Sequence, residues 1–358
     1  MCGLPGHNLD QTRTDAFAQQ MLTIINHSGL ALMISIGHRV KLFDTLAGLN
    51  WVTSHQLAEA AGLSERYVRE WLGAMATGNI VEHNAADKTY RLPPEHASWL
   101  TRAASPNNLA VSTQFVSILG GIEDAAVAAF QHGRGIPYSA YPRFHQVMAE
   151  ESLQSVVSGL VEQILPLAPG WTERLQQGID VLDIGCGSGR AMMHLAQHFP
   201  QSRFVGEDFS PEVIAAATAE ARRRGLSNIK FQVQDAAAMT ARQQFDLITA
   251  FDAIHDQARP AKVLQNIAQA LRPGGLFLMQ DISGSGQVHT DKQHPVGPFL
   301  YTISCLHCMS VSLSMDGPGL GAMWGKELAL QMLSEAGFAR VRVETLEHDP
   351  MNFWYFAQ

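Results

Sequence analysis

A glycine-rich loop that follows an expected strand is the segment of this 358-residue sequence best suited to holding a ligand. The loop reads Asp183-Ile184-Gly185-Cys186-Gly187-Ser188-Gly189 and leads into a helical pattern from Arg190. Glycines at alternate positions allow backbone N–H groups and the start of a helix to approach a polar or anionic group closely. A dinucleotide loop, G-x-G-x-x-G, would need glycine at position 190. The loop therefore favours a nucleoside cofactor without a pyrophosphate over NAD or flavin.

Acidic residues end the two expected strands that come next. Asp208 ends the segment 203–208, where its carboxylate could accept hydrogen bonds from both hydroxyls of a ribose, and Phe209 could pack on a purine ring. Asp235 ends the segment 229–235, where it could accept a hydrogen bond from an exocyclic amino group. We expect the cofactor to contact Asp183, Gly185, Cys186, Gly187, Gly189, Asp208, Phe209, Asp235, Ala236 and Phe251.

A histidine and an aspartate follow the fourth and fifth expected strands. His255 comes after the segment 245–251, at the carboxyl edge where open α/β sheets bind ligands. Imidazole titrates near neutrality, so His255 could remove a proton from an O–H or S–H group. Asp281 lies at the end of the neighbouring segment 276–282 and could fix the tautomer of His255. Asp256 is adjacent to His255 in the chain and would point in a different direction.

Strand and helix patterns alternate beyond residue 178 and predict the architecture that positions these side chains. Such βα units predict a doubly wound, mostly parallel sheet. A loose stretch is expected over 283–324, followed by a helix over 326–336. The expected strands are 179–184, 203–208, 229–235, 245–251, 276–282, 340–346 and 351–358, with further helices beginning near 190, 211 and 260.

The first half of the sequence is mainly helical by pattern. Apolar residues at helical spacing over 12–49 predict two or three helices, with a break near Ser28-Gly29. Residues 108–165 are also expected to be helical, around a loop at 132–137.

Residues 53–92 have the pattern of a winged helix: helix, glycine-containing turn, helix and short hairpin. Thr53 or Ser54 is expected to cap the first helix and Ser64, with Glu65, the second. Pro93-Pro94 is expected to end the unit.

The glycine loop and the acids after it occur in the order typical of class I S-adenosylmethionine-dependent methyltransferases, which the chain resembles over roughly residues 175–358. In that family the loop acid and glycines hold the methionine part of the cofactor, and the acids matched by Asp208 and Asp235 hold ribose and adenine. The resemblance implies an α/β fold with a Rossmann-like seven-stranded sheet. It also implies S-adenosyl-L-methionine as methyl donor and S-adenosyl-L-homocysteine as product.

The adjacent residues His255 and Asp256, followed by a helix and LRPGG, are similar to the corresponding segment of the plant-type and antibiotic-type O-methyltransferases. The architecture of the whole chain resembles bacterial winged-helix methyltransferases. The resemblance implies that His255 is the general base and that Asp281 supports it. It further implies a helical dimerisation and winged-helix domain over 1–105, a helical linker that lines the acceptor pocket over 106–175, and a methyltransferase domain over 176–358. The resemblance also implies a homodimer formed through the N-terminal helices. Gln257 replaces the family's usual tryptophan, and Asp281 its usual glutamate.

Composition limits the compartment and the partners. A net charge of -8 and a pI near 6.0 give no general attraction to nucleic acid or anionic lipid. The sequence lacks an uninterrupted apolar run of roughly 18 residues and a basic, apolar leader, so we expect a cytoplasmic protein without a membrane partner. Residues 53–92 hold four basic and five acidic residues, which disfavours a DNA-reading regulator that senses S-adenosylmethionine.

The segment 299–315 is the candidate acceptor lid. It contains Cys305, His307 and Cys308, but one Cys-x-x-Cys pair does not complete a tetrahedral zinc site, so we expect buried cysteines and no metal. Its lack of Lys and Arg indicates a small-molecule acceptor with little charge. We expect Tyr138, Tyr141, Tyr301 and His307 to line the acceptor pocket.

The predicted reaction is methyl transfer to a hydroxyl or thiol of that acceptor. S-methylation of small thiols or sulfide specifically is the alternative, and N- and C-acceptors stay open.

Overall fold

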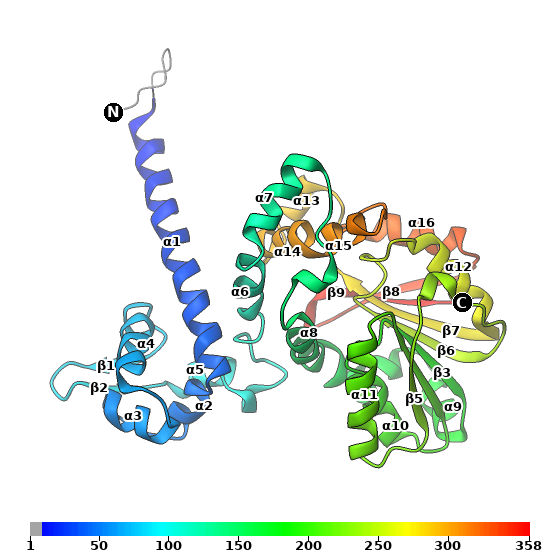
Figure 1. The fold of residues 1–358 in the computed structure, drawn as a ribbon, viewed down its shortest axis with the longest axis horizontal. Helices are drawn as coiled ribbons and strands as arrows, with labels where there is room; N and C mark the ends of the chain where they lie inside the picture. Colours follow the sequence, from blue (N-terminus) through cyan, green and yellow to red (C-terminus); the bar gives the residue numbers. More distant parts are fainter. Residues whose placement is uncertain (1–8) are drawn as a thin grey trace. The chain divides into compact units, whose positions relative to one another are not determined.

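The computed structural model describes residues 9–358 (Figure 1). The chain folds into two compact units that divide between Ser117 and Ile118. The expected linker, 106–175, is divided by this boundary, and its larger part, 118–175, folds together with the sheet-forming segments. Each unit has its own buried core.

A single long helix, α1 (Gln11–Arg39), opens the first unit. The expected break near Ser28-Gly29 is wrong: the Ser28 hydroxyl donates to the Ile24 carbonyl within the helix at 2.8 Å. One glycine costs a helix only about 1 kcal/mol, which the remaining turns tolerate. Asp10 caps the N-terminus by accepting a hydrogen bond from the Arg13 amide.

Much of the apolar surface of α1 is exposed. Phe17 and Ile25 are each 61% exposed, and burial is confined to the C-terminal part of the helix around Ser35, Gly37 and His38. By length and composition alone, α1 could cross a membrane, and only 17% of its most apolar 18-residue window is buried. Polar residues interrupt the apolar face of α1, so its sequence contains no uninterrupted apolar run of that length.

A winged helix forms the rest of the first unit's core, as the pattern over 53–92 predicted. Trp71 is its central side chain: it is 2% exposed, its indole N–H donates to the Met33 carbonyl at 2.9 Å, and its ring meets Phe43 edge-on. The elements are α2 (Leu42–Ala47), α3 (Ser54–Ala61), α4 (Glu65–Thr77), β1 (Glu82–Asn84), β2 (Thr89–Arg91) and α5 (Pro94–Leu100).

The capping predictions for this unit have mixed outcomes. Thr53 forms a full capping box with Gln56, whereas Ser64 occupies the N-cap of α4 without a side-chain hydrogen bond. Pro93-Pro94 does not end the unit. Pro94 begins α5 instead, because the first position of a helix needs no amide hydrogen.

A seven-stranded sheet is the centre of the second unit and confirms the predicted fold class. The strands lie in the order β5-β4-β3-β6-β7-β9-β8, and all pairs are parallel except those made by β9. The strands are β3 (Asp180–Ile184), β4 (Arg203–Asp208), β5 (Ile229–Val233), β6 (Phe245–Phe251), β7 (Leu271–Ile282), β8 (Val341–Leu346) and β9 (Asp349–Ala357).

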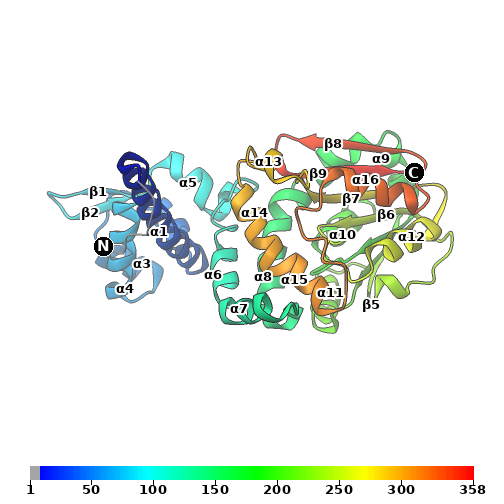
Figure 2. The same ribbon diagram turned by 90° about the horizontal axis from the view of Figure 1, so that it is seen from above.

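Helices cover both faces of the sheet, with a hydrophobic core on each (Figures 1 and 2). On one face, α12 and α16 pack on β3, β6 and β7, and on the other, α9 and α10 pack on the same strands. The helices are α6 (Gln114–Gly120), α7 (Glu123–His132), α8 (Phe144–Ser152), α9 (Trp171–Gln177), α10 (Arg190–His198), α11 (Pro211–Arg223), α12 (Pro260–Ala270) and α16 (Lys326–Glu335). Short 3-10 and π turns occupy 138–140 and 153–167.

The stretch 283–324, expected to be loose, is largely helical. It forms α13 (Val288–Asp291), α14 (Gly297–Ile303), a π-helical turn (Ser304–Cys308) and α15 (Met309–Ser314), beside α8 (Figure 2). The loop at 132–137 docks on it: the Ile136 amide donates to the Ser310 hydroxyl at 2.8 Å, and the Tyr141 hydroxyl donates to the Leu306 carbonyl.

Gly135 allows this loop to approach α15, and its replacement tests the docking. A Cβ at Gly135 would lie 2.0 Å from the Ser310 carbonyl oxygen and 2.2 Å from the Ser314 nitrogen. We expect Gly135→Ala to destabilise the protein by about 1–3 kcal/mol, because overpacking forces backbone atoms apart. The midpoint of thermal unfolding should fall by several degrees. Gly120→Ala is the control, since a Cβ there meets nothing within 4 Å; equal midpoints would contradict the docking.

Candidate active site

The glycine loop at the end of β3 adopts a conformation that side chains disfavour. Gly185, Gly187 and Gly189 have φ of 68°, 51° and 69°, in the left-handed region. The space beside Gly187 is open, whereas a Cβ on Gly185 would lie 2.6 Å from the Ala253 side chain. The loop therefore packs directly against the segment that carries His255 and leaves open space at its tip.

The predicted acids stand at the carboxyl ends of three adjacent strands. Asp183 is buried and accepts a hydrogen bond from the Thr249 hydroxyl at 2.6 Å, and burial raises its pKa to about 7. Asp208 accepts from the Gly187 and Ser210 amides at 3.0 and 2.9 Å, which ties the end of β4 to the glycine loop.

The third acid, Asp235, lies two residues beyond the end of β5 and is half-exposed. It accepts from the Ala237 amide at 2.8 Å and from Arg259 at 3.1 Å. Ala236 beside it is buried. A carboxylate after each of three neighbouring strands, with open space at Gly187, fits a cofactor that presents an amine, a ribose and a purine.

The two aromatic candidates lie in different environments. Phe209 is 49% exposed and meets Tyr138 edge-on, with ring centroids 5.6 Å apart, so its ring joins the cofactor loop to the acceptor segment. Phe251 packs 5.9 Å from the Trp354 ring, against the core beneath the sheet.

His255 and Asp281 form a buried hydrogen-bonded pair. His255 Nδ1 lies 2.7 Å from Asp281 Oδ1, and the two residues are 3% and 0% exposed. The parallel register of β6 and β7, which pairs Phe251 with Gln280, brings the ends of the two strands level. Because a carboxylate only accepts, the neutral ring carries its hydrogen on Nδ1, and Nε2 is the nitrogen that can accept a proton.

The electrostatics of the pair favour a protonated imidazole. Burial alone would lower the pKa of His255, but the charge and hydrogen bond of Asp281, with a contribution from Cys308, raise it well above its ordinary value. Asp281 is held in turn by the Trp324 indole N–H at 3.0 Å and the Ile282 amide at 2.9 Å. The imidazolium that forms when His255 takes up a proton is therefore stabilised by Asp281.

Aromatic rings surround His307 in the segment expected to form the acceptor lid. The imidazole stacks on Phe144 with centroids 3.7 Å apart, and Tyr138 and Tyr141 meet it edge-on at 5.3 and 4.7 Å. Both ring nitrogens lack a hydrogen-bond partner among the described residues, and burial lowers the pKa to about 3. Tyr301 points elsewhere: its hydroxyl donates to Asp291 at 2.8 Å.

Several residues of the site were not predicted from the sequence. Thr249, Asp252, Trp324, Phe144 and Cys308 all contact predicted site residues or lie within their cluster. Of these, Asp252 follows β6 directly and had the same signal as Asp183 and Asp208, a carboxylate at the carboxyl end of a strand. The other four come from segments whose neighbours only the tertiary fold defines.

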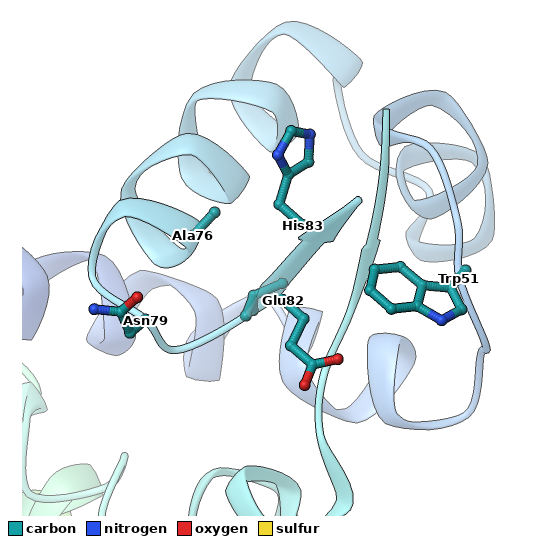
Figure 3. Close-up of a pocket in the computed structure, with 6 residues that line it drawn as sticks. Trp51, Ala76, Asn79, Glu82 and His83 are labelled. Carbon is teal, nitrogen blue, oxygen red and sulfur yellow. The ribbon is translucent and has the colours of Figure 1, made fainter. Parts of the chain in front are cut away.

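The winged helix shows few features of a nucleic-acid interface. Arg66, Arg69 and Arg91 each pair with a glutamate of the same unit, so their charges are largely compensated. A shallow hollow of about 450 Å³ lies beside the hairpin (Figure 3). It is lined by Trp51, Ala76, Asn79, Val81, Glu82 and His83. The one acidic residue among these six, Glu82, accepts a hydrogen bond from Arg91. The six residues do not include a hydrogen-bonded pair of the His255–Asp281 kind.

The fold, the glycine loop and the buried pair together define the class of S-adenosylmethionine-dependent methyltransferases. Residues 175–337 match a methyltransferase domain, and residues 28–102 match the Rv2258c-like winged HTH domain. The chain thus carries a winged helix-turn-helix domain followed by a methyltransferase domain.

Known proteins of this fold are similar in architecture more than in sequence. The mitomycin 7-O-methyltransferase has a TM-score of 0.70 at 17% identity, covering 98% of this chain and 100% of that one. Human N-acetylserotonin methyltransferase, in complex with S-adenosylmethionine, has a TM-score of 0.65 at 17% identity, covering 99% of both chains. The ubiquinone biosynthesis O-methyltransferase of Leptothrix cholodnii is 28% identical over 128 residues, 34% of this chain and 54% of that protein. The chain thus spans about half the length of the curated relatives it matches.

The role of Asp281 predicts a shift in the titration of His255. In Asp281→Asn the charge is lost while burial remains, so the pKa of His255 should fall. A base acts when unprotonated, so activity rises as pH increases through this pKa, and the acid limb should move to lower pH. Histidine NMR titration measures the pKa without an acceptor, with kcat/KM against pH as the kinetic counterpart. Asp291→Asn, which removes an acid bound to Tyr301, should leave the titration unchanged; an unmoved pKa in Asp281→Asn would contradict the coupling.

Proposed function

We propose that the chain transfers the methyl group of S-adenosylmethionine to a hydroxyl group of a small, uncharged acceptor, with His255 as general base. The observation that carries the proposal is the buried His255–Asp281 hydrogen bond of 2.7 Å, on a segment that packs against the glycine loop. This juxtaposition supports a base beside the cofactor loop.

The cofactor would be held by the loop and the three strand-end acids. Asp183 and the glycines would hold its methionine part, Asp208 its ribose, and Asp235 with Ala236 its adenine. When bound, S-adenosylmethionine supplies an electrophilic methyl group. The task of the chain is then to align the acceptor oxygen and remove its proton.

The same pair would handle that proton. With its Nδ1–H directed at Asp281, the ring would accept the acceptor's proton at Nε2, and the Asp281 carboxylate would stabilise the imidazolium. Trp324 would keep Asp281 in place through its hydrogen bond. A hydroxyl acceptor fits the O-methyltransferases among the structural relatives; S-methylation needs the same base, and no contact in the site favours it.

The aromatic cluster around His307 would form the acceptor wall. Tyr138, Tyr141 and Phe144 present ring surfaces, and the neutral His307 offers an unpaired nitrogen that a polar group of the acceptor could bind. These groups favour a planar molecule without charge.

Release of S-adenosylhomocysteine tests the reaction and the base together. Phenols, carboxylic acids, thiols and sulfide are offered to the wild type, His255→Ala and the control His132→Ala, in which the replaced histidine is exposed. We expect turnover of a phenol by the wild type and the control, and a loss of about 10²–10⁴-fold in His255→Ala. Thermal unfolding checks that each variant folds, and cofactor binding should be unchanged. Equal rates in all three proteins would exclude His255 as the base.

We also propose a homodimer formed through α1. Its exposed apolar residues Phe17, Met21 and Ile25 lie on one side of the helix, at the spacing by which two helices pack. A second copy of the helix would cover this face.

The oligomeric state follows from light scattering after size exclusion. The wild type should have twice the monomer mass of 39.1 kDa. Ile25→Glu should give monomers, because a charge would enter the apolar contact, whereas Gln19→Glu, on the opposite side of the helix, should stay dimeric. A monomeric wild type, or a dimer that Ile25→Glu leaves intact, would contradict the proposal.

A further inference from the structure

The proposed base and two carboxylates form a cluster of side chains that commonly bind metal ions. Asp252, His255 and Asp281 each offer one ligand atom, and the three atoms lie within 4.8 Å of one another. Asp252 comes from the turn after β6, with a left-handed φ of 50°. Its amide donates to the Gln280 carbonyl at 3.0 Å, which fixes this turn to β7 and holds the carboxylate near Asp281.

Two carboxylate oxygens in this cluster lack partners. Asp281 Oδ1 accepts three hydrogen bonds, from His255, Trp324 and Ile282, whereas Oδ2 has no partner among the described residues. Asp252 is similar: Oδ2 accepts from Gln280 at 3.1 Å, and Oδ1 is inaccessible and has no partner within 9–358. A buried oxygen left unsatisfied costs about 1–3 kcal/mol, so both atoms indicate a missing partner.

A cation is the partner that fits this set of donors. Two carboxylates held this close in a buried setting repel each other, and a divalent ion between them removes the repulsion. Mg²⁺ and Ca²⁺ prefer oxygen ligands alone, whereas one imidazole with two carboxylates suits Zn²⁺ and similar ions. Ligands at about 2.1 Å from a tetrahedral ion lie roughly 3.4 Å apart, a spacing between the 2.7 Å separation of His255 from Asp281 and the 4.8 Å that bounds the cluster.

We propose that Asp252, His255 and Asp281 form a binding site for one first-row divalent cation such as Zn²⁺, and that its occupation switches off the base. The inhibitory half rests on the proposed function. The cation takes Nδ1 of His255, so the hydrogen shared with Asp281 leaves that nitrogen and the neutral ring carries it on Nε2 instead. That tautomer cannot accept a proton from an acceptor hydroxyl. A cation therefore inhibits through the ring that it binds, with no need to reach the acceptor wall.

Metal binding is measured directly, without acceptor or cofactor. Untagged protein is stripped with EDTA, the chelator is removed, and Co²⁺ is titrated by its visible absorption and Zn²⁺ by competition with a chromophoric chelator. We expect one ion per chain with the intensity of a four-coordinate Co²⁺ site. Asp252→Asn should weaken binding on the order of 10-fold or more while retaining the His255–Asp281 hydrogen bond. The matched control Asp256→Asn changes a neighbouring acid outside the cluster and should bind as the wild type does.

Methyl-transfer rates with and without Zn²⁺ then test the proposed inhibition separately from metal binding. Zn²⁺ at a concentration that halves the wild-type rate should reduce the Asp256→Asn rate equally and the Asp252→Asn rate by no more than about a tenth, as a 10-fold weaker site requires. EDTA should reverse the inhibition. Thermal unfolding confirms that both variants fold. The proposal is overturned if no ion binds stoichiometrically, or if Asp252→Asn binds as tightly as the wild type. If the ion binds at this site but no acceptor is ever methylated, the proposed function fails while the metal site stands.

Discussion

The buried hydrogen bond between His255 and Asp281 depends on the register of the sheet, on burial and on a third side chain. It exists because β6 and β7 are parallel neighbours in register, so that side chains 26 residues apart meet where the two strands end. Burial alone would favour a neutral imidazole, and the nearby carboxylate reverses that preference. The indole of Trp324, brought in from the segment before α16, holds the carboxylate. Core packing on both faces of the sheet is thus the condition for a charge-stabilising pair at its edge.

The proposed acceptor wall is built from two segments that stabilise each other. The loop before α8 reaches α15 through Gly135 and Ile136, and the ring of His307 then stacks on Phe144. The edge of Tyr138 connects this cluster to Phe209 at the cofactor loop. A buried imidazole with two unpaired nitrogens is costly in a finished core, and this cost is consistent with a surface that a polar acceptor completes.

The first unit has the winged-helix fold without the positive charge that DNA binding needs. Its winged helix has the shape of a DNA-reading module, yet three of its arginines are paired with glutamates of the same unit. Its unusual feature is instead the apolar face of α1, which is exposed at Phe17, Met21 and Ile25 and is buried only near the C-terminal end of the helix. Exposed apolar area of this extent indicates contact with another surface.

The sequence by itself determined the elements and the positions of the acids, because hydrophobic periodicity and glycine conformation act within a few residues. The strands over 203–208 and 245–251, the glycine loop and the winged helix were predictable for that reason, and Asp281 was expected beside His255 from the order of βα units. Only the tertiary structure decided that 297–314 is helical, that α1 continues through Ser28-Gly29, and that Trp324 joins the pair. Those outcomes depend on which distant segments share a buried space, and burial sets hydrogen-bond partners and protonation in a way that local spacing does not encode.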